Sequence, residues 1–139
     1  MAINSRTKGA NFEREIGNLL QEALSLKNPV RRILEQTRTK ELPDLKLGRW
    51  CLECKRYGAG SEPLDDWWEQ VVNATGENEF SALIYKFNRR PIKVRILAST
   101  LNPQLPANIK VDLLWDDFLV VLKERFQEDI LIHESSPTN

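Results

Sequence analysis

The chain has 139 residues, of which 41% are hydrophobic and 29% charged, a composition typical of one globular domain. Its 20 Lys and Arg balance its 20 Asp and Glu, which argues against a general polyanion binder. No apolar run is long enough to span a membrane, and the N-terminus lacks the apolar stretch of a signal peptide. We therefore expect one cytoplasmic domain over residues 1–139, with no membrane partner.

The first predicted element is an amphipathic helix over residues 8–26, after a flexible arm at residues 1–6. Its apolar side chains follow helical spacing: Phe12, Ile16, Leu19, Leu20, Ala23 and Leu24. At about 100° per residue, Glu13 leans toward this apolar stripe, whereas Glu15 lies farther round and Arg14 points outward. A carboxylate at the edge of a buried face needs a partner, which a metal ion could supply. The alternative is a first-turn Glu favoured by the helix dipole.

A strand is predicted from Val30 to Gln36, followed by a polar, basic loop at residues 37–40. The stretch from Leu42 to Arg56 then predicts a tight β-hairpin, because its side chains alternate in character on both sides of Gly48-Arg49. Glycine at the first central position is typical of a two-residue type II′ turn. This turn fixes which residues of the two strands face each other.

The predicted register brings two carboxylates together. The facing pairs are Leu47 with Trp50, Lys46 with Cys51, Leu45 with Leu52, Asp44 with Glu53, and Leu42 with Lys55. Like charges directly opposite each other, about 5 Å apart at Cβ, destabilise a sheet unless they are compensated. A hard divalent cation such as Mg²⁺ would compensate them, and Lys55 shares the face of Glu53. The alternatives are an ordinary solvated hairpin face or a protonated acid.

The two cysteines do not predict a zinc site. Cys51 and Cys54 have C-x-x-C spacing, but on a strand they point to opposite faces, and the sequence offers neither a second Cys pair nor paired histidines. We interpret both as reduced packing residues. The lone His133 lies too near the polar end of the chain to be a convincing catalyst.

Charge is distributed unevenly along the chain. Residues 27–56 hold nine Lys or Arg against four acids, a net charge of +5, whereas residues 57–139 hold eight basic and thirteen acidic residues. The positive charge therefore surrounds the predicted hairpin, where it could meet phosphates. The alternative is a solvated run of charge with no binding role.

The remaining elements complete an α+β arrangement. A helix is predicted to start at Ser61-Glu62-Pro63, with an apolar stripe that ends near Gly76, and its Trp67 and Trp68 are interpreted as packing residues. A second hairpin (Ser81–Phe87 and Ile92–Ser99) and a last helix (Trp115–Phe126) follow, and residues 133–139 are expected to form a flexible tail. The predicted order is α-β-β-β-α-β-β-α, with a central mixed sheet flanked by helices.

These motifs resemble a known nuclease superfamily. Pro43-Asp44 followed by Glu53-Cys54-Lys55 is similar to the PD-(D/E)xK signature, and Lys8 to Glu15 resembles the opening helix of archaeal-type Holliday junction resolvases. Glu69-Gln70 on the following helix also matches several of those resolvases. The resemblance covers roughly the first half of the chain and implies a restriction-endonuclease-like core, which viral, repair and restriction enzymes share.

The resemblance also implies a set of site residues. Asp44, Glu53 and the backbone carbonyl of Cys54 would coordinate Mg²⁺ or Mn²⁺, Glu13 would complete the acidic cluster, and Lys55 would position or polarise the attacking water. In-line attack would then leave a 5′-phosphate. Gln70 is expected just outside these groups. Contacts to the DNA backbone are expected from Arg6, Lys8, Arg14, Thr37, Arg38, Thr39 and Lys40.

The expected function is metal-dependent, structure-selective cleavage of DNA, with paired phosphodiester hydrolysis that resolves four-way (Holliday) junctions during recombination. The resemblance implies a homodimer on branched DNA, because a junction needs two symmetric incisions. No Gly-rich phosphate loop is present, so no nucleotide cofactor is expected. If the source is viral, the host cytoplasm is the expected location. The alternatives are a repair- or restriction-type endonuclease and a non-catalytic nucleic-acid-binding protein that keeps the fold.

Overall fold

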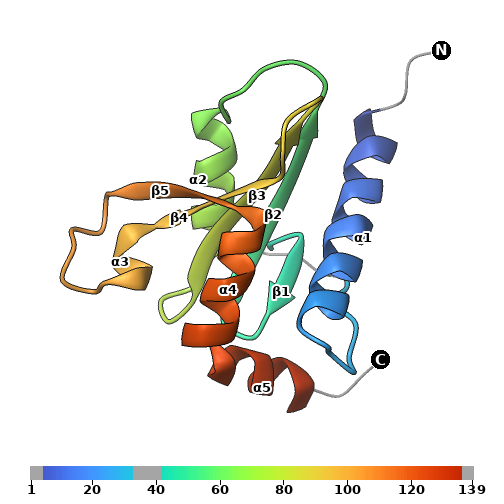
Figure 1. The fold of residues 1–139 in the computed structure, drawn as a ribbon. Coiled ribbons are helices and arrows are strands. Elements are labelled where there is room, and N and C mark those ends of the chain that lie inside the picture. Colours follow the sequence, from blue (N-terminus) through green and yellow to red (C-terminus); the bar gives the residue numbers. More distant parts are fainter. Residues whose placement is uncertain (1–4, 33–41, 136–139) are drawn as a thin grey trace.

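The computed structural model describes residues 5–32 and 42–135 and has a five-stranded mixed sheet at its centre (Figure 1). The elements are α1 (Ser5–Ala23), β1 (Leu45–Leu47), β2 (Trp50–Tyr57), α2 (Asp65–Asn73), β3 (Phe80–Phe87), β4 (Lys93–Leu97), α3 (Ala98–Leu101), β5 (Lys110–Leu114), α4 (Trp115–Arg125) and α5 (Gln127–Ser135). The strands lie in chain order, with β2 and β3 parallel and the other neighbours antiparallel. This architecture confirms the predicted α+β class with a mixed sheet.

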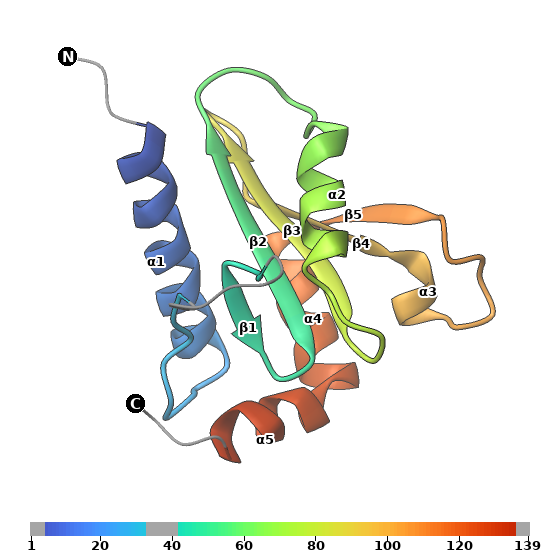
Figure 2. The same ribbon diagram turned by 180° about the vertical axis from the view of Figure 1, so that it is seen from behind.

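Helices cover both faces of the sheet, and α2 and α4 lie on opposite sides (Figures 1 and 2). The larger core joins α1 and α4 to one face, where Ile16, Trp50 and Phe118 are fully buried. The smaller core packs α2 on the other face through Trp67, Trp68 and neighbouring aromatic residues. No helix within residues 5–32 or 42–135 combines the length and apolar character that crossing a membrane requires.

The first hairpin has the predicted register. Leu45 pairs with Leu52, Lys46 with Cys51, and Leu47 with Trp50. The φ angle is +57° at Gly48 and is not positive at Arg49, as expected for a type II′ turn. The ladder ends at Leu45, so Asp44 leaves the strand at the level of Glu53.

The topology differs from the prediction in the strands. Residues 30–32 contribute an isolated bridge from Arg32 to Leu45, and residues 33–36 of the predicted strand lie outside the described residues. The strand β5, which was not predicted, forms the far edge of the sheet against β4. The predicted order therefore lacked β5, because its five residues follow a proline-punctuated loop and are too short to stand out by alternation.

The C-terminal segment forms a helix that the sequence pattern did not predict. Helix α5 continues through Ser135, so residues 133–135 of the expected tail are helical, and residues 136–139 lie outside the described part. Glu134 accepts hydrogen bonds from the backbone N–H groups of Lys27 and Asn28, at 2.7 and 2.9 Å, and His133 Nε2 lies 2.9 Å from the Asn28 carbonyl oxygen. This contact ties α5 to the loop that leaves α1.

A buried ion pair also holds α5 against the first hairpin. Asp129 is fully buried and accepts hydrogen bonds from the Arg49 backbone N–H and from Nε and Nη2 of the same residue, at 2.8 to 3.0 Å. The guanidinium also lies over the Phe80 ring at 5.1 Å. A Cβ on Gly48 would come within 2.5 Å of the Asp129 carbonyl oxygen, so the turn requires glycine for space as well as for φ.

We expect Arg49→Ala to lower the free energy of unfolding by about 3 kcal/mol, because it leaves the buried Asp129 carboxylate without its guanidinium. Urea unfolding at pH 7 measures the change. Lys123→Ala, which removes an exposed cation from α4, should change the same quantity by no more than about 0.5 kcal/mol. Equal effects of the two substitutions would contradict a stabilising role for the Arg49–Asp129 pair.

Candidate active site

The residues predicted to form the site come from two neighbouring elements and the segment before β1. Glu13 lies on α1, Asp44 directly precedes β1, and Glu53 and Lys55 lie on β2. Because β1 spans only three residues, the later part of β2 has no β1 partner on that side, and α1 lies beside it (Figures 1 and 2). The short edge strand thus opens a space in which α1 can bring a side chain to the two hairpin carboxylates.

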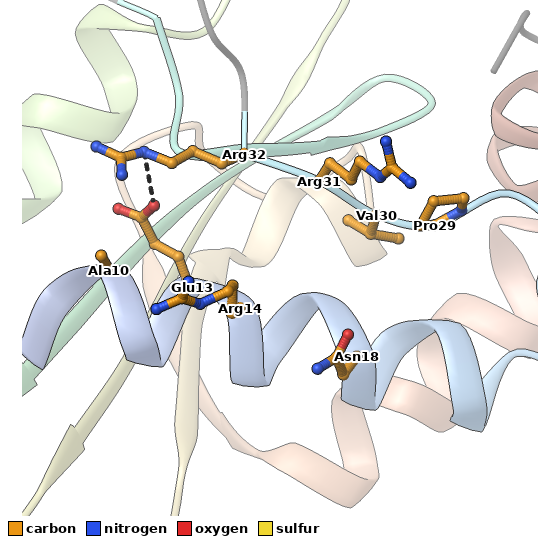
Figure 3. Close-up of a pocket in the computed structure, with 8 residues that line it drawn as sticks. All are labelled: Ala10, Glu13, Arg14, Asn18, Pro29, Val30, Arg31 and Arg32. Atoms are coloured by element: carbon orange, nitrogen blue, oxygen red, sulfur yellow. Dashed lines mark ion pairs between the residues drawn. The ribbon is translucent and has the colours of Figure 1, made fainter. Parts of the chain in front are cut away.

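Glu13 points inward, as its helical phase predicts. Its residue surface is 8% exposed, whereas Arg14 and Glu15 are exposed. Arg32 Nε lies 3.1 Å from Glu13 Oε2 in an ion pair (Figure 3). Oε2 is nevertheless buried without a hydrogen-bond donor among the described residues. A buried carboxylate oxygen with a free lone pair is a ready acceptor for a cation or a water.

Asp44 and Glu53 adjoin each other at the start of the hairpin. Asp44 Oδ2 accepts a hydrogen bond from the Cys54 backbone N–H at 2.9 Å, which fixes the carboxylate over β2. Burial, followed by the charge of Asp44 and a hydrogen bond with it, raises the pKa of Glu53 to about 9. The nearby Lys55 ammonium acts in the opposite direction and lowers this pKa. Glu53, which is 3% exposed, therefore lies close to both an acid and a lysine.

Glu13 belongs to the same electrostatic cluster. Burial and the charge of Asp44 raise its pKa to about 7, while Arg32 and Lys55 oppose the rise. The structure therefore brings together all four residues that the sequence predicted: Glu13, Asp44, Glu53 and Lys55. Because the three acids interact, their protons belong to the cluster as a whole rather than to separate sites.

The donor set fits a hard divalent cation. Burial and the charge of Asp44 raise the pKa of Glu53, and among the residues that the structure describes the three acids share only two nearby cations, Arg32 and Lys55, so the cluster carries an excess of acidic groups. In the described part of the chain, no three His, Cys, Asp or Glu side chains are already grouped as a metal cage. Mg²⁺ suits such a site, since it takes one or two carboxylates and keeps waters as its remaining ligands.

The raised pKa values give the metal-free protein a specific pH dependence. In the folded state the acidic cluster holds protons well above the ordinary pKa of 4.5, since the pKa of Glu13 is raised to about 7 and that of Glu53 to about 9. The stability that this proton binding contributes is fully present below about pH 4.5, and it is lost as the pH rises through the folded-state pKa values. We expect the free energy of unfolding, measured in urea with EDTA, to fall between about pH 5 and pH 9.

Glu53→Gln should flatten the upper part of this pH profile, because the amide does not titrate. The matched control is Glu15→Gln, which changes an exposed acid of α1. A wild-type profile that is level over the same pH range would contradict the buried, proton-sharing cluster.

A cleft of about 570 Å³ adjoins Glu13. It is lined by Ala10, Glu13, Arg14, Asn18, Pro29, Val30, Arg31 and Arg32. Figure 3 shows Arg32 reaching over α1 to Glu13, while Arg31 points away from it. The Arg32 side chain is 58% exposed, so it remains accessible to solvent while it pairs with Glu13. From the sequence, Arg31 and Arg32 were expected only to belong to a basic segment. Their place in the lining of this cleft depends on how the loop after α1 folds, which sequence periodicity does not predict.

The other predicted site residues lie as follows. Cys54 is buried in the larger core, with its backbone beside Asp44, and Cys51 is buried on the opposite face; both are free thiols. Arg14 lines the cleft and donates a hydrogen bond to Asn11. Gln70 is exposed on α2. Arg6 and Lys8 belong to the first turn of α1, and Thr37, Arg38, Thr39 and Lys40 lie outside the described residues.

Comparison with known proteins identifies one family. The model of the family described as "Phage putative PDDEXK endonuclease" matches residues 4–131. That range contains Glu13, Asp44, Glu53 and Lys55. No curated protein and no solved structure matches the chain.

Proposed function

We propose, from the premise that the chain belongs to the phage PDDEXK endonuclease family, that it is a metal-dependent DNA endonuclease. The observation that carries this proposal is the convergence of Glu13, Asp44 and Glu53 beside Lys55 at one end of a short hairpin. A protein that only bound nucleic acid would lose affinity by placing three acids next to phosphate. A nuclease gains from them once a cation is bound.

Asp44 and Glu53 would hold Mg²⁺ or Mn²⁺, with the Cys54 carbonyl oxygen as a further ligand and Glu13 acting directly or through water. A bound cation would lower the pKa of a water molecule and neutralise negative charge at the scissile phosphate. The role of the Cys54 N–H, which donates to Asp44, is to keep that carboxylate oriented. Arg32 would hold Glu13 in place until the cluster is occupied.

Lys55 is the side chain suited to orient the attacking water. It lies two residues after Glu53 on β2, and its ammonium is close enough to lower the pKa of both Glu53 and Glu13. A water held between Lys55 and the acids would be oriented for in-line attack on phosphorus. The product expected from this superfamily chemistry is a 5′-phosphate.

The finer proposal is that the DNA substrate is branched and that two copies of the chain cut it symmetrically. The N-terminal helix that supplies Glu13 supports this choice, since it resembles the opening helix of archaeal-type junction resolvases. We propose a homodimer, with the exposed Val72 of α2 and Leu64 directly before that helix as its contact. Positive charge from Arg14 and Arg32 beside the cleft, with the predicted contacts at Arg38 and Lys40, would hold the DNA backbone.

Incubation of the protein with a synthetic four-way junction, a flap and a linear duplex of matched sequence tests the proposal. With Mg²⁺ or Mn²⁺ we expect paired nicks in opposite arms of the junction, and with EDTA none. Equal cutting of junction and duplex would leave a broader endonuclease. No cutting of any DNA with either metal would overturn the nuclease proposal and favour the binding-protein alternative.

Glu13→Gln should slow cleavage by about a hundredfold, because it removes a buried carboxylate from the acidic cluster. Glu15→Gln removes the same charge from the exposed side of the same helix and should leave the rate within about twofold. Single-turnover cleavage with saturating protein measures both rates. Equal losses in the two variants would show that Glu13 has no special place in the site.

A further inference from the structure

An exposed aromatic residue lies beside the proposed active site. Tyr57, the last residue of β2, is 48% exposed and lies beyond the part of that strand that pairs with β1. It alternates with Glu53 and Lys55, so it projects from the same face of the strand. Two residues along a strand span about 7 Å, which places Tyr57 next to the lysine that would act at the scissile phosphate.

The Tyr57 ring is held in position from one side. Trp67 of α2 stacks on it with ring centroids 4.7 Å apart and an interplanar angle of 25°. Trp67 in turn stacks on Phe87 at 5.9 Å and is itself buried. Because Trp67 covers one face of the ring, the exposed surface of Tyr57 is the other face and the edge. Its orientation is fixed before any ligand arrives, which lowers the entropic cost of stacking.

Two arginines lie on a turn next to this aromatic residue. The turn between β3 and β4 carries Arg89 and Arg90, both exposed, and it adjoins the end of β2 through a hydrogen bond from the Asn88 N–H to the Gly58 carbonyl at 3.2 Å. Arg56 and Lys86 alternate with Tyr57 and Phe87 along β2 and β3, so they project from the opposite face of the sheet and are not part of this surface. No acidic side chain among the described residues forms an ion pair with Arg89 or Arg90. Their charge is therefore available to phosphates.

We propose that Tyr57 and the Arg89-Arg90 turn bind unpaired nucleotides of the DNA substrate next to the cut. An open aromatic face accepts any base by stacking, and flanking cations hold the backbone without reading sequence. Inside a fully paired duplex the bases are stacked on each other and cannot reach Tyr57. The substrate class is thus DNA with unpaired nucleotides beside the scissile phosphate, an inference that rests on the proposed endonuclease function.

Equilibrium binding in Ca²⁺ and in EDTA tests the inference with the full chain. The probes are a fluorescein-labelled duplex with a single-stranded flap and the matched linear duplex, and a 2-aminopurine in the flap reports stacking. We expect Tyr57→Ala to weaken binding of the flap DNA by roughly tenfold or more, with little change for the duplex, and to abolish quenching of the 2-aminopurine. Tyr57→Phe, which keeps the ring, should behave as the wild type.

The turn is tested with Arg89→Asn combined with Arg90→Ala. Asparagine suits the positive φ of 64° at Arg89. This double variant should reduce the salt dependence of flap binding by up to about two charges, whereas Lys123→Ala with Arg125→Ala, which removes the same charge from α4, should not.

Two results would overturn this inference: equal losses on flap and duplex with Tyr57→Ala, or a flap 2-aminopurine that the wild-type protein does not quench. Since binding is measured without cleavage, the outcome is separate from that of the nuclease proposal. A protein that prefers flap DNA through Tyr57 but cuts nothing with Mg²⁺ would refute the nuclease alone. A protein that cuts DNA with no such preference would refute only the stacking surface.

Discussion

We expect Glu53→Gln and Asp44→Asn each to lower the rate of DNA cleavage by at least about a thousandfold, because each removes a carboxylate from the site proposed to hold the cation. The same substitutions should raise the stability of the metal-free protein above pH 7. Asp44 raises the pKa of Glu53, and an amide in place of either acid ends the repulsion between them. Single-turnover cleavage and urea unfolding in EDTA measure the two effects.

Opposite changes in activity and stability distinguish a catalytic pair from a structural one. If either amide variant unfolded more easily and lost cleavage in proportion, the two acids would be part of the framework rather than of the chemistry. Glu124→Gln, which changes an exposed acid on α4, is the matched control and should change neither quantity appreciably.

Lys55→Ala is the second substitution with a large expected effect. We expect cleavage to fall by about a thousandfold while the affinity for DNA, measured in Ca²⁺, changes by no more than about threefold, since one phosphate contact among several contributes little to binding. Lys55→Arg should not restore the rate, because a planar guanidinium does not place its donors where the ammonium does.

The control for the lysine is Lys123→Ala, which removes an equal charge from an exposed position on α4. A Lys55→Ala variant that cuts DNA at the wild-type rate would remove Lys55 from the mechanism. A variant that loses binding and cleavage equally would make it a substrate-binding residue instead.

The parts of the site that could be predicted from the sequence are those set by local geometry. The Gly48-Arg49 turn determines the hairpin register, and register alone brings Asp44 to Glu53. Helical phase alone distinguishes the buried Glu13 from the exposed Glu15. In both cases the periodicity of one element decides where a side chain points.

The features that escaped prediction depend on contacts between distant segments. Strand β5 gains its partner only when β4 lies beside it, and α5 is positioned by Arg49, eighty residues before Asp129. The Arg32 ion pair with Glu13 requires the loop after α1 to fold back over that helix. Likewise, the exposed ring of Tyr57 becomes notable only because Trp67 stacks on it. No pattern within one element contains this information.

Calorimetric titration of Mn²⁺ in two buffers of different ionisation enthalpy tests the acidic cluster most directly, because it measures both the affinity for the cation and the protons released. At pH 7 the buried Glu53 and part of Glu13 hold protons that a bound cation must displace. We predict that wild-type protein binds Mn²⁺ with proton release, and that Asp44→Asn and Glu53→Gln lose most of this binding, whereas Glu15→Gln binds as the wild type does. Unchanged Mn²⁺ binding in both Asp44→Asn and Glu53→Gln would contradict the metal site on which the proposed function depends.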